Sequence, residues 1–332
     1  MEQVFFMASK DALDNITSTF NFLHPLNASL QFTRKAINDL IAKQPQISDF
    51  EIKRTIDPDD LVHGVAYRNS FVDTMWNAQE DKLAWLLLNN LFAIHEGWAQ
   101  RLYEDSFSDY YTPELIKTLE FPGLSNQLSD CFINVILHPK LTSQKIPGTL
   151  KSSIIMALKS SALESAFFQE YKNACTYDFA KLENYLLCYR CFKEVRNCFM
   201  HHNCVASQQL KKAFDSYIQI ATINDLGVKE VPIISTPVVG NSIQLKLRTV
   251  IGFSQIVRRI IIISDINLLC TKAAENEFLK RTPPKWTCHT LNGDLSRAKG
   301  QIIRYSTKMG FLKPRWTQEY QDFLIANNIF SR

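Results

Sequence analysis

An arginine, an asparagine and two histidines stand close together in one stretch of the sequence, EVRNCFMHHN, at residues 194–203. An imidazole can take up and release a proton near neutral pH, and a guanidinium can hold a phosphate through two parallel hydrogen bonds. Two of the seven histidines of the chain are adjacent here. These residue types suit acid–base chemistry on a phosphate ester, provided that a rigid element positions them.

The surrounding residues predict a helix from about Tyr177 to His202, with one apolar stripe that faces the core. On a helical wheel of about 100° per residue, this stripe contains Leu187, Cys188, Cys191, Phe192, Val195, Cys198, Phe199 and His202. The cysteines, with nearby Cys204 and His201, have some likeness to a zinc site, but zinc-binding CxxC pairs usually lie in turns. We therefore predict that the thiols pack in the core, that no metal binds, and that His202 is a buried, hydrogen-bonded histidine.

The other face of the predicted helix contains the reactive groups. Asn197 and His201 lie one turn apart, so their side chains can touch. Arg196 lies about 140° from His201 around the helix, too far for both to reach one small group within a single chain. A two-fold axis beside this helix would bring Arg196 of one chain to His201 of the other. The spacing predicts a site that is completed by a second copy.

A second helix, predicted over about 80–105, contains a carboxyl group among apolar neighbours, Glu96 in AIHEGW. An acid in such surroundings needs a partner. Arg196 or His201 can provide it, and the alternative is an ordinary ion pair with Arg101 or a lysine of the same helix.

The composition predicts a mainly α-helical fold. Hydrophobic residues make up 46% of the 332 residues, whereas glycine and proline number only 10 and 12, which favours long helices over short strands and turns. The N-terminus has no basic region before its short apolar run, and the longest apolar stretch is too short to cross a bilayer. We expect a cytoplasmic protein without a membrane segment, whose eight cysteines remain thiols.

Periodicity and turn residues divide the chain into three predicted parts. These are an N-terminal extension at 1–55, a helical domain at 56–272 and a basic helical segment at 273–332. Further helices are predicted from Asp57, over 206–223 and over 250–270, with short helices joined by loops at 107–150. After a Gly-Asn turn signal, alternating apolar residues predict a small β-hairpin at about 230–248.

The last part of the chain concentrates positive charge. Between 278 and 316 there are nine basic residues and one acid, Asp294, with aromatic residues interspersed. Such a segment suits phosphate neutralisation and base stacking, and the alternative is a solvated basic face on ordinary helices. The candidate RNA contacts are Lys280, Arg281, Lys285, Arg297, Lys299 and Arg304.

The run RNCFMH, from Arg196 to His201, resembles the R-polar-xxx-H signature of the HEPN superfamily. Members of this family are α-helical bundles that commonly dimerise with the signature at the interface. The helix with IHEGW resembles an acid-plus-tryptophan helix upstream of the signature, although the tryptophan usually precedes the acid there. The match covers about 57–270. It implies a HEPN-like bundle, a homodimer through the signature helix, and supporting roles for Glu96 and His202.

Many members of this family are metal-independent endoribonucleases of toxin–antitoxin and phage-defence systems. By the same resemblance, His201 would move a proton at the RNA 2′-hydroxyl or the leaving 5′-oxygen, and Arg196 would neutralise the phosphorane. Asn197 would orient the imidazole or donate to the phosphate. The expected products have 2′,3′-cyclic phosphate and 5′-hydroxyl ends, and DNA is not expected to be cut. No cofactor is required, and an antitoxin or other regulatory partner is expected.

Two other functions are open at this point. HEPN-like bundles also serve as non-catalytic dimerisation modules, and the basic C-terminal segment alone would suit a nucleic-acid-binding protein. The sequence contains no glycine-rich nucleotide loop, no HExxH and no GxSxG. RNSFV at Arg68 and Asn69 begins like the signature, but Asp73 stands where the histidine is needed, so we discount a second site.

Overall fold

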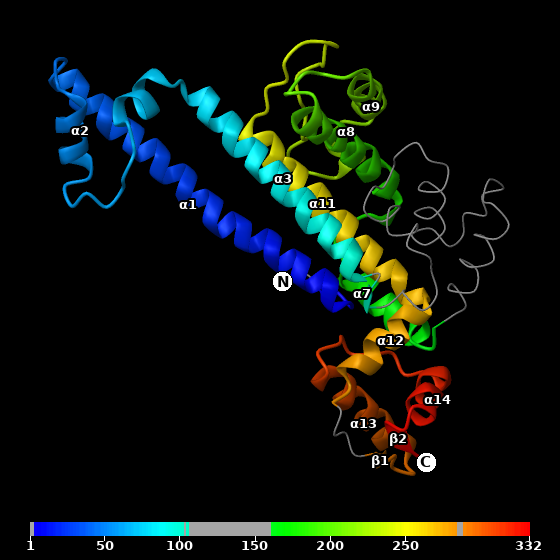
Figure 1. The fold of residues 1–332 in the computed structure, drawn as a ribbon. Helices are drawn as coiled ribbons and strands as arrows, with labels where there is room; N and C mark the ends of the chain where they lie inside the picture. The colour runs from blue at the N-terminus through cyan, green and yellow to red at the C-terminus, as the bar shows by residue number, and fades with distance from the viewer. Residues whose placement is uncertain (1–2, 103, 106–160, 284–287) are drawn as a thin grey trace.

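The computed structural model describes residues 3–102, 104–105, 161–283 and 288–332. Four long helices form a bundle: α1 (Met7–Lys43), α3 (Trp76–Leu102), α8 (Leu182–His201) and α11 (Leu247–Asn267). The helix α11 is central, because it packs against each of the other three (Figure 1). Every residue from Ile260 to Asn267 is buried, as expected for a helix that is surrounded on all sides. The prediction of a mainly α-helical fold is confirmed.

Shorter elements complete the described chain. The helices are α2 (Asp49–Ile56), α7 (Gln169–Ala174), α9 (Gln208–Ile218), α10 (Ile223–Leu226), α12 (Lys272–Arg281), α13 (Leu295–Lys308) and α14 (Gln318–Ala326). Single π or 3₁₀ turns lie at Asn69–Asp73, Glu164–Phe168, Phe179–Lys181 and Leu268–Cys270. The strands β1 (His289–Thr290) and β2 (Phe330–Ser331) pair in parallel beside α13 and α14 (Figure 1). One hydrophobic core extends from Phe5 to Phe330, and a smaller one lies at the far end of α1.

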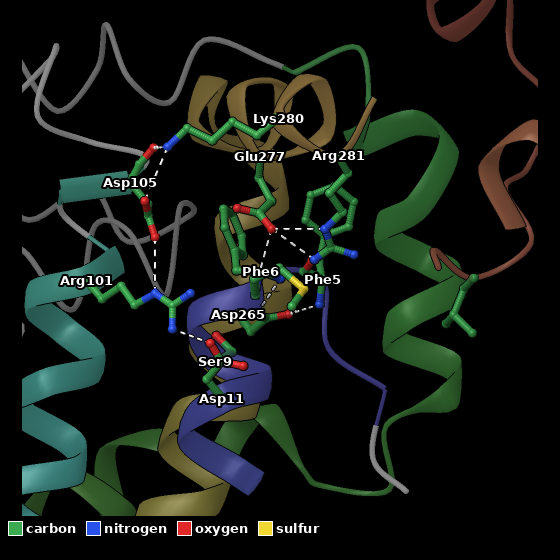
Figure 2. A network of polar contacts seen from close by, with 12 residues as sticks. Phe5, Phe6, Ser9, Asp11, Arg101, Asp105, Asp265, Glu277, Lys280 and Arg281 are labelled. Carbon is green, nitrogen blue, oxygen red and sulfur yellow. Dashed lines mark hydrogen bonds and ion pairs between the residues drawn. The ribbon is translucent and has the colours of Figure 1, made fainter. Parts of the chain in front are cut away.

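The first turn of α1 is capped by carboxylates from distant parts of the chain. Its own N-cap residue, Phe6, offers no side-chain hydrogen bond, and the first turn contains no acid. Asp265 of α11 instead accepts hydrogen bonds from the backbone N–H groups of Phe5 at 2.5 Å and Phe6 at 2.9 Å. Glu277 of α12 accepts from the N–H of Met7 at 2.9 Å, and Figure 2 shows the two carboxylates meeting the helix end. Acceptor oxygens are favourable there, because the N–H groups of a first helical turn lack partners within the helix.

The helix predicted from Asp57 is wrong. Residues 57–66 form turns and extended chain, only 67–73 is helical within the predicted stretch, and α3 begins at Trp76. The Asp57 carboxylate does cap backbone N–H groups, those of Leu61 and Val62 at 2.9 Å each. The acids near this point therefore stabilise a loop, whereas in the sequence they look like the start of a helix.

The β-hairpin predicted at about 230–248 is also wrong. The segment is extended but does not pair with itself, and an isolated antiparallel bridge joins Ser242 to Val205. The N–H of Ile243 donates to the carbonyl of Cys204 at 2.8 Å, and Ile243 and Leu245 are buried in the core. The alternating apolar residues therefore pack against the connection between α8 and α9 and bury it. The short helices predicted at 107–150 lie outside the described residues.

Candidate functional site

The signature stretch lies at the C-terminal end of α8, in a rigid turn. The helix ends at His201, and Asn203 and Cys204 then take left-handed backbone conformations with φ of 49° and 62°. The N–H groups of His202 and Cys204 both donate to the carbonyl of Cys198, at 2.9 and 3.1 Å. Ser207 then caps α9 by accepting from the N–H of Leu210. These hydrogen bonds fix the backbone where α8 ends and α9 begins. Asn203 and Cys204 adopt the left-handed conformation there, which is uncommon for residues other than glycine.

Core packing of the cysteine stripe is confirmed. Cys188, Cys191 and Cys198 are buried together with Phe192, which stacks on Phe253 of α11 with 4.4 Å between ring centroids. Burial raises the pKa of the Cys188 thiol to about 12. At neutral pH this thiol is therefore a neutral, apolar filler.

The expectation of a buried His202 is wrong. His202 is exposed, because α8 ends one residue earlier and the chain leaves the helical path. The wheel that predicted its burial assumed a helix that continues through this position. His202 is therefore a second surface imidazole beside His201.

Glu96 of α3 contacts α8, and its nearest partner is a residue that the sequence did not indicate. Glu96 Oε1 lies 2.5 Å from Nζ of Lys193 and 3.8 Å from Nη1 of Arg196. The Lys193 side chain is only 3% exposed, and its ammonium group lies 5.1 Å from the centre of the Phe92 ring. The predicted contact with Arg196 is thus present but secondary, and Glu96 mainly compensates a buried lysine.

We expect Glu96→Ala to lower the free energy of unfolding by about 2–3 kcal/mol, because it leaves the buried Lys193 ammonium without its carboxylate. The effect is below that of a fully buried pair, because the Glu96 side chain is 26% exposed. Glu96→Gln retains a hydrogen-bond acceptor and is expected to cost less. Urea unfolding of the two variants measures the difference, and equal losses would mean that charge is unimportant here.

A buried histidine beside Glu96 escaped the sequence analysis. His95 is fully buried, and its Nδ1 lies 3.0 Å from the hydroxyl of Tyr189. Burial, together with the charge of Lys193, lowers the pKa of His95 to about 3. His95 is therefore neutral at physiological pH and cannot serve as a proton donor in its charged form. The apolar periodicity of AIHEGW was the available signal, because it places His95 on the buried face.

Most of the buried polar side-chain atoms that lack a hydrogen-bond partner among the described residues belong to α3 and α8. Seven such side-chain atoms occur among the described residues. Five of them belong to these two helices: Gln79 Oε1, Asn89 Oδ1, His95 Nε2, Arg190 Nε and Arg196 Nε. Unsatisfied buried polar atoms are uncommon in native proteins and need an explanation. Two of these atoms, Arg190 Nε and Arg196 Nε, are guanidinium donors about 9 Å apart along α8, so each would need its own acceptor.

Asn197 and His201 lie on the solvent side of α8. Asn197 is partly exposed, and its Nδ2 lies 3.4 Å from Oε2 of Glu194, one turn earlier. His201 is exposed. Arg196, with its side chain 25% exposed, is directed towards α3 by Glu96. Arg196 and His201 are therefore not brought together within the described chain. Their separation of about 140° on the helical wheel predicts this result.

The six candidate RNA contacts are in different situations. Lys280 pairs with Asp105, and Arg281 donates to Glu277 (Figure 2). The Arg281 guanidinium also lies over the ring of Phe311, 4.4 Å from its centre. The ammonium group of Lys299 lies 4.2 Å from the centre of the Trp316 ring. Lys285 lies outside the described residues. The remaining two, Arg297 and Arg304, are exposed on α13.

Searches of protein-family models, of curated proteins and of solved structures found no match to this chain. Within the described ranges, no helix combines the length and the apolar character that a membrane span requires.

Proposed function

We propose that this protein is a metal-independent endoribonuclease whose site forms at the end of α8. The observation that carries the proposal is Arg196 Nε, a buried guanidinium donor without a hydrogen-bond partner on the same helix as the exposed His201. Arginine is well suited to hold a phosphate, because its donors form a planar fork. The resemblance of RNCFMH to the HEPN signature is a second argument for the same function.

The reaction needs no group beyond the side chains and the RNA itself. His201 takes the proton from a 2′-hydroxyl, and the 2′-oxygen attacks the adjacent phosphorus. The bond from phosphorus to the 5′-oxygen then breaks, and that oxygen takes up a proton from a His201 imidazolium. Arg196 neutralises the charge on the phosphoryl oxygens, and Asn197 orients the imidazole or donates to the phosphate. The products have a 2′,3′-cyclic phosphate and a 5′-hydroxyl.

The proposed active unit is a homodimer. Arg196 and His201 point in different directions from one helix, so a second copy with its α8 alongside supplies the missing group. The free solvent side of α8, with Asn197 and His201, is the surface that the partner would cover. We also propose a cytoplasmic location in a toxin–antitoxin or phage-defence system, with an antitoxin or other regulatory partner that restrains the nuclease.

Incubation of the purified protein with total RNA, in buffer containing EDTA, tests the proposal. We expect fragments whose 5′ ends accept phosphate from a polynucleotide kinase without prior treatment, because these ends are hydroxyls. Single-stranded DNA of the same length is expected to stay intact, because it lacks the 2′-hydroxyl. Intact RNA, or cleavage of DNA at a similar rate, would contradict the proposal.

A non-catalytic dimerisation module is the second candidate. The contact between Glu96 and Arg196 favours it, because a guanidinium held by a carboxylate can be purely structural. Light scattering after size-exclusion chromatography separates the two functions when combined with the RNA assay. A stable dimer that cuts no RNA identifies the module, whereas a dimer that cuts RNA identifies the enzyme.

A further inference from the structure

The positive charge of this protein is concentrated in its last 45 residues. Residues 288–332 contain seven basic and three acidic side chains, a surplus of four. The whole chain has 37 basic and 33 acidic side chains, which is the same surplus of four. The rest of the chain is therefore balanced, and the unit built from α13, α14, β1 and β2 is the part that attracts a polyanion.

Part of this charge lines a groove on the outer face of α13. The groove has a volume of about 460 Å³, and its lining residues are Asn292, Ser296, Arg297, Gly300, Gln301 and Arg304. Arg297 and Arg304 are seven residues apart, which places them on the same face of the helix at a separation of about 10 Å along its axis. Neither forms an ion pair with any residue in the part of the chain that the structure describes.

The groove has open space at its middle, and hydrogen bonds hold the loop beside it. Gly300 lies between the two arginines, and a Cβ atom added there would meet nothing within 4 Å. Gln301 accepts from the N–H of Asn292 at 2.8 Å and donates to the carbonyl of Thr290 at 3.3 Å, so it fixes the loop beside α13. The opposite face of α13 is anchored in the core by Ala298, Ile302 and Tyr305. Both arginines are therefore exposed on a helix whose opposite face is anchored in the core.

We propose that this groove binds the sugar-phosphate backbone of single-stranded RNA, with Arg297 and Arg304 each contacting a phosphate. The inference rests on the proposed function, since the strand would be the substrate that the α8 site cuts. Both guanidinium groups match phosphate oxygens through two parallel hydrogen bonds, and Ser296 and Asn292 supply neutral donors at the rim. Contacts of this kind position a strand without reading its bases.

Binding of a labelled deoxythymidine oligonucleotide, followed by fluorescence anisotropy at several salt concentrations, tests the groove apart from catalysis. This probe has the phosphates but no 2′-hydroxyl, so it cannot be cut by the proposed reaction. We expect Arg297→Ala with Arg304→Ala to weaken binding roughly tenfold or more. The slope of log K against log salt is expected to fall by about 1.4, because each phosphate contact on a single strand contributes about 0.7.

The matched control is Lys313→Ala with Arg315→Ala, which removes the same charge from two exposed residues outside the groove. We expect this variant to bind nearly as wild type does. Equal losses in both double variants would overturn the inference, because bulk charge would then explain the binding. Unchanged binding in the groove variant, or no binding by the wild type, would overturn it as well.

A second variant tests the same groove without removing an arginine. Gly300→Glu places a carboxylate between the two guanidinium groups, where the backbone leaves open space. We expect it to weaken binding at least as much as the double variant, and unchanged binding contradicts the inference. A protein that binds the oligonucleotide but cuts no RNA would refute the nuclease proposal alone. A protein that cuts RNA while the groove variant binds normally would refute only the groove.

Discussion

We expect His201→Ala to lower the rate of RNA cleavage by roughly 10²- to 10⁴-fold, the usual contribution of a positioned acid–base group. The loss arises because the 2′-hydroxyl keeps its proton and the 5′-oxygen leaves without one. The fold should be unaffected, because His201 is exposed at the end of α8. Cleavage of an end-labelled RNA under single-turnover conditions measures the rate, and thermal unfolding verifies the fold.

The neighbouring imidazole provides the matched control. His202 is also exposed and directly follows His201, so His202→Ala removes the same chemical group from the next position. We expect it to retain most of the activity. Full activity in His201→Ala would move the chemistry elsewhere. Loss of activity in His202→Ala alone, with unchanged thermal stability, would assign the proton transfer to the other histidine.

A mixture of two inactive variants distinguishes a shared site from a site within one chain. Arg196→Ala is expected to be inactive, because the phosphorane loses its neutralising group. In a mixed dimer, the His201→Ala chain supplies Arg196 and the Arg196→Ala chain supplies His201, so one intact site is formed. After subunit exchange, we expect the mixture to regain about a quarter of the wild-type activity, from random pairing. No recovery would contradict a site built from two copies.

Expressing the wild type and His201→Ala from an inducible promoter extends this test to the cell. The nuclease proposal predicts growth arrest and degraded RNA with the wild type alone.

The sequence predicts the helices that have one strong buried face. The patterns at 80–105 and 250–270 correspond to α3 and α11, because these helices bury apolar residues on every turn. The helix expected over 206–223 is shorter in the structure, where α9 ends at Ile218 and α10 begins at Ile223. A single helix was expected because apolar residues continue at Ile220 and Ala221, which pack on the core from a turn.

The sequence does not predict the long helix α1 in the N-terminal extension, because the apolar periodicity is interrupted in the middle of this helix. In α1, no residue between Leu23 and Ile37 is buried, and Pro25 lies inside the helix. Proline normally disrupts a helix interior, since it lacks an N–H. This helix is stabilised by tertiary contacts at its two ends, which local periodicity cannot reveal.

The candidate site was predicted in part. The wheel gave the separation of Arg196 from His201, and the apolar setting of Glu96 gave a contact with α8. Lys193 was missed, because a lysine in a sequence is normally read as exposed, and its burial depends on a carboxylate from another helix. The turn at Asn203 and Cys204, which exposes His202, depends on the segment at 240–243 and has no local signal.

The second large effect is expected in stability: Asp265→Ala should lower the free energy of unfolding by about 3–5 kcal/mol near pH 5. The carboxyl group is completely buried and accepts from Phe5, Phe6 and the hydroxyl of Ser9. Its removal leaves these buried donors without an acceptor, at a cost of about 1–3 kcal/mol each. Ser9 also accepts from Nε1 of Trp98 at 3.0 Å, so the change extends to the contact between α1 and α3.

Urea unfolding followed by circular dichroism measures this effect, with Asp39→Ala as the control. Asp39 lies on α1 but is exposed, so its replacement is expected to change stability by less than about 0.5 kcal/mol. Asp265→Asn is a second informative variant. Its amide matches the neutral acid in size and charge but keeps only one acceptor oxygen for the N–H groups, so we expect a loss smaller than that of alanine.

The effect of Asp265 should depend on pH in a defined direction. Burial raises its pKa from 3.8 to about 7, against the opposing influence of the hydrogen bonds and of Arg281. Between these values the folded state binds a proton that the unfolded state has released, so this contribution is fully present below about pH 4 and is lost as the pH rises through about 7. The other charged group at this end of α1, Glu277, is held by Arg281 at 2.9 Å and is present in both proteins. We therefore expect the stability difference between wild type and Asp265→Ala to be larger at pH 5 than at pH 8. A difference that grows towards pH 8 would mean that the ionised carboxylate, rather than the neutral acid, is the form that stabilises the end of α1.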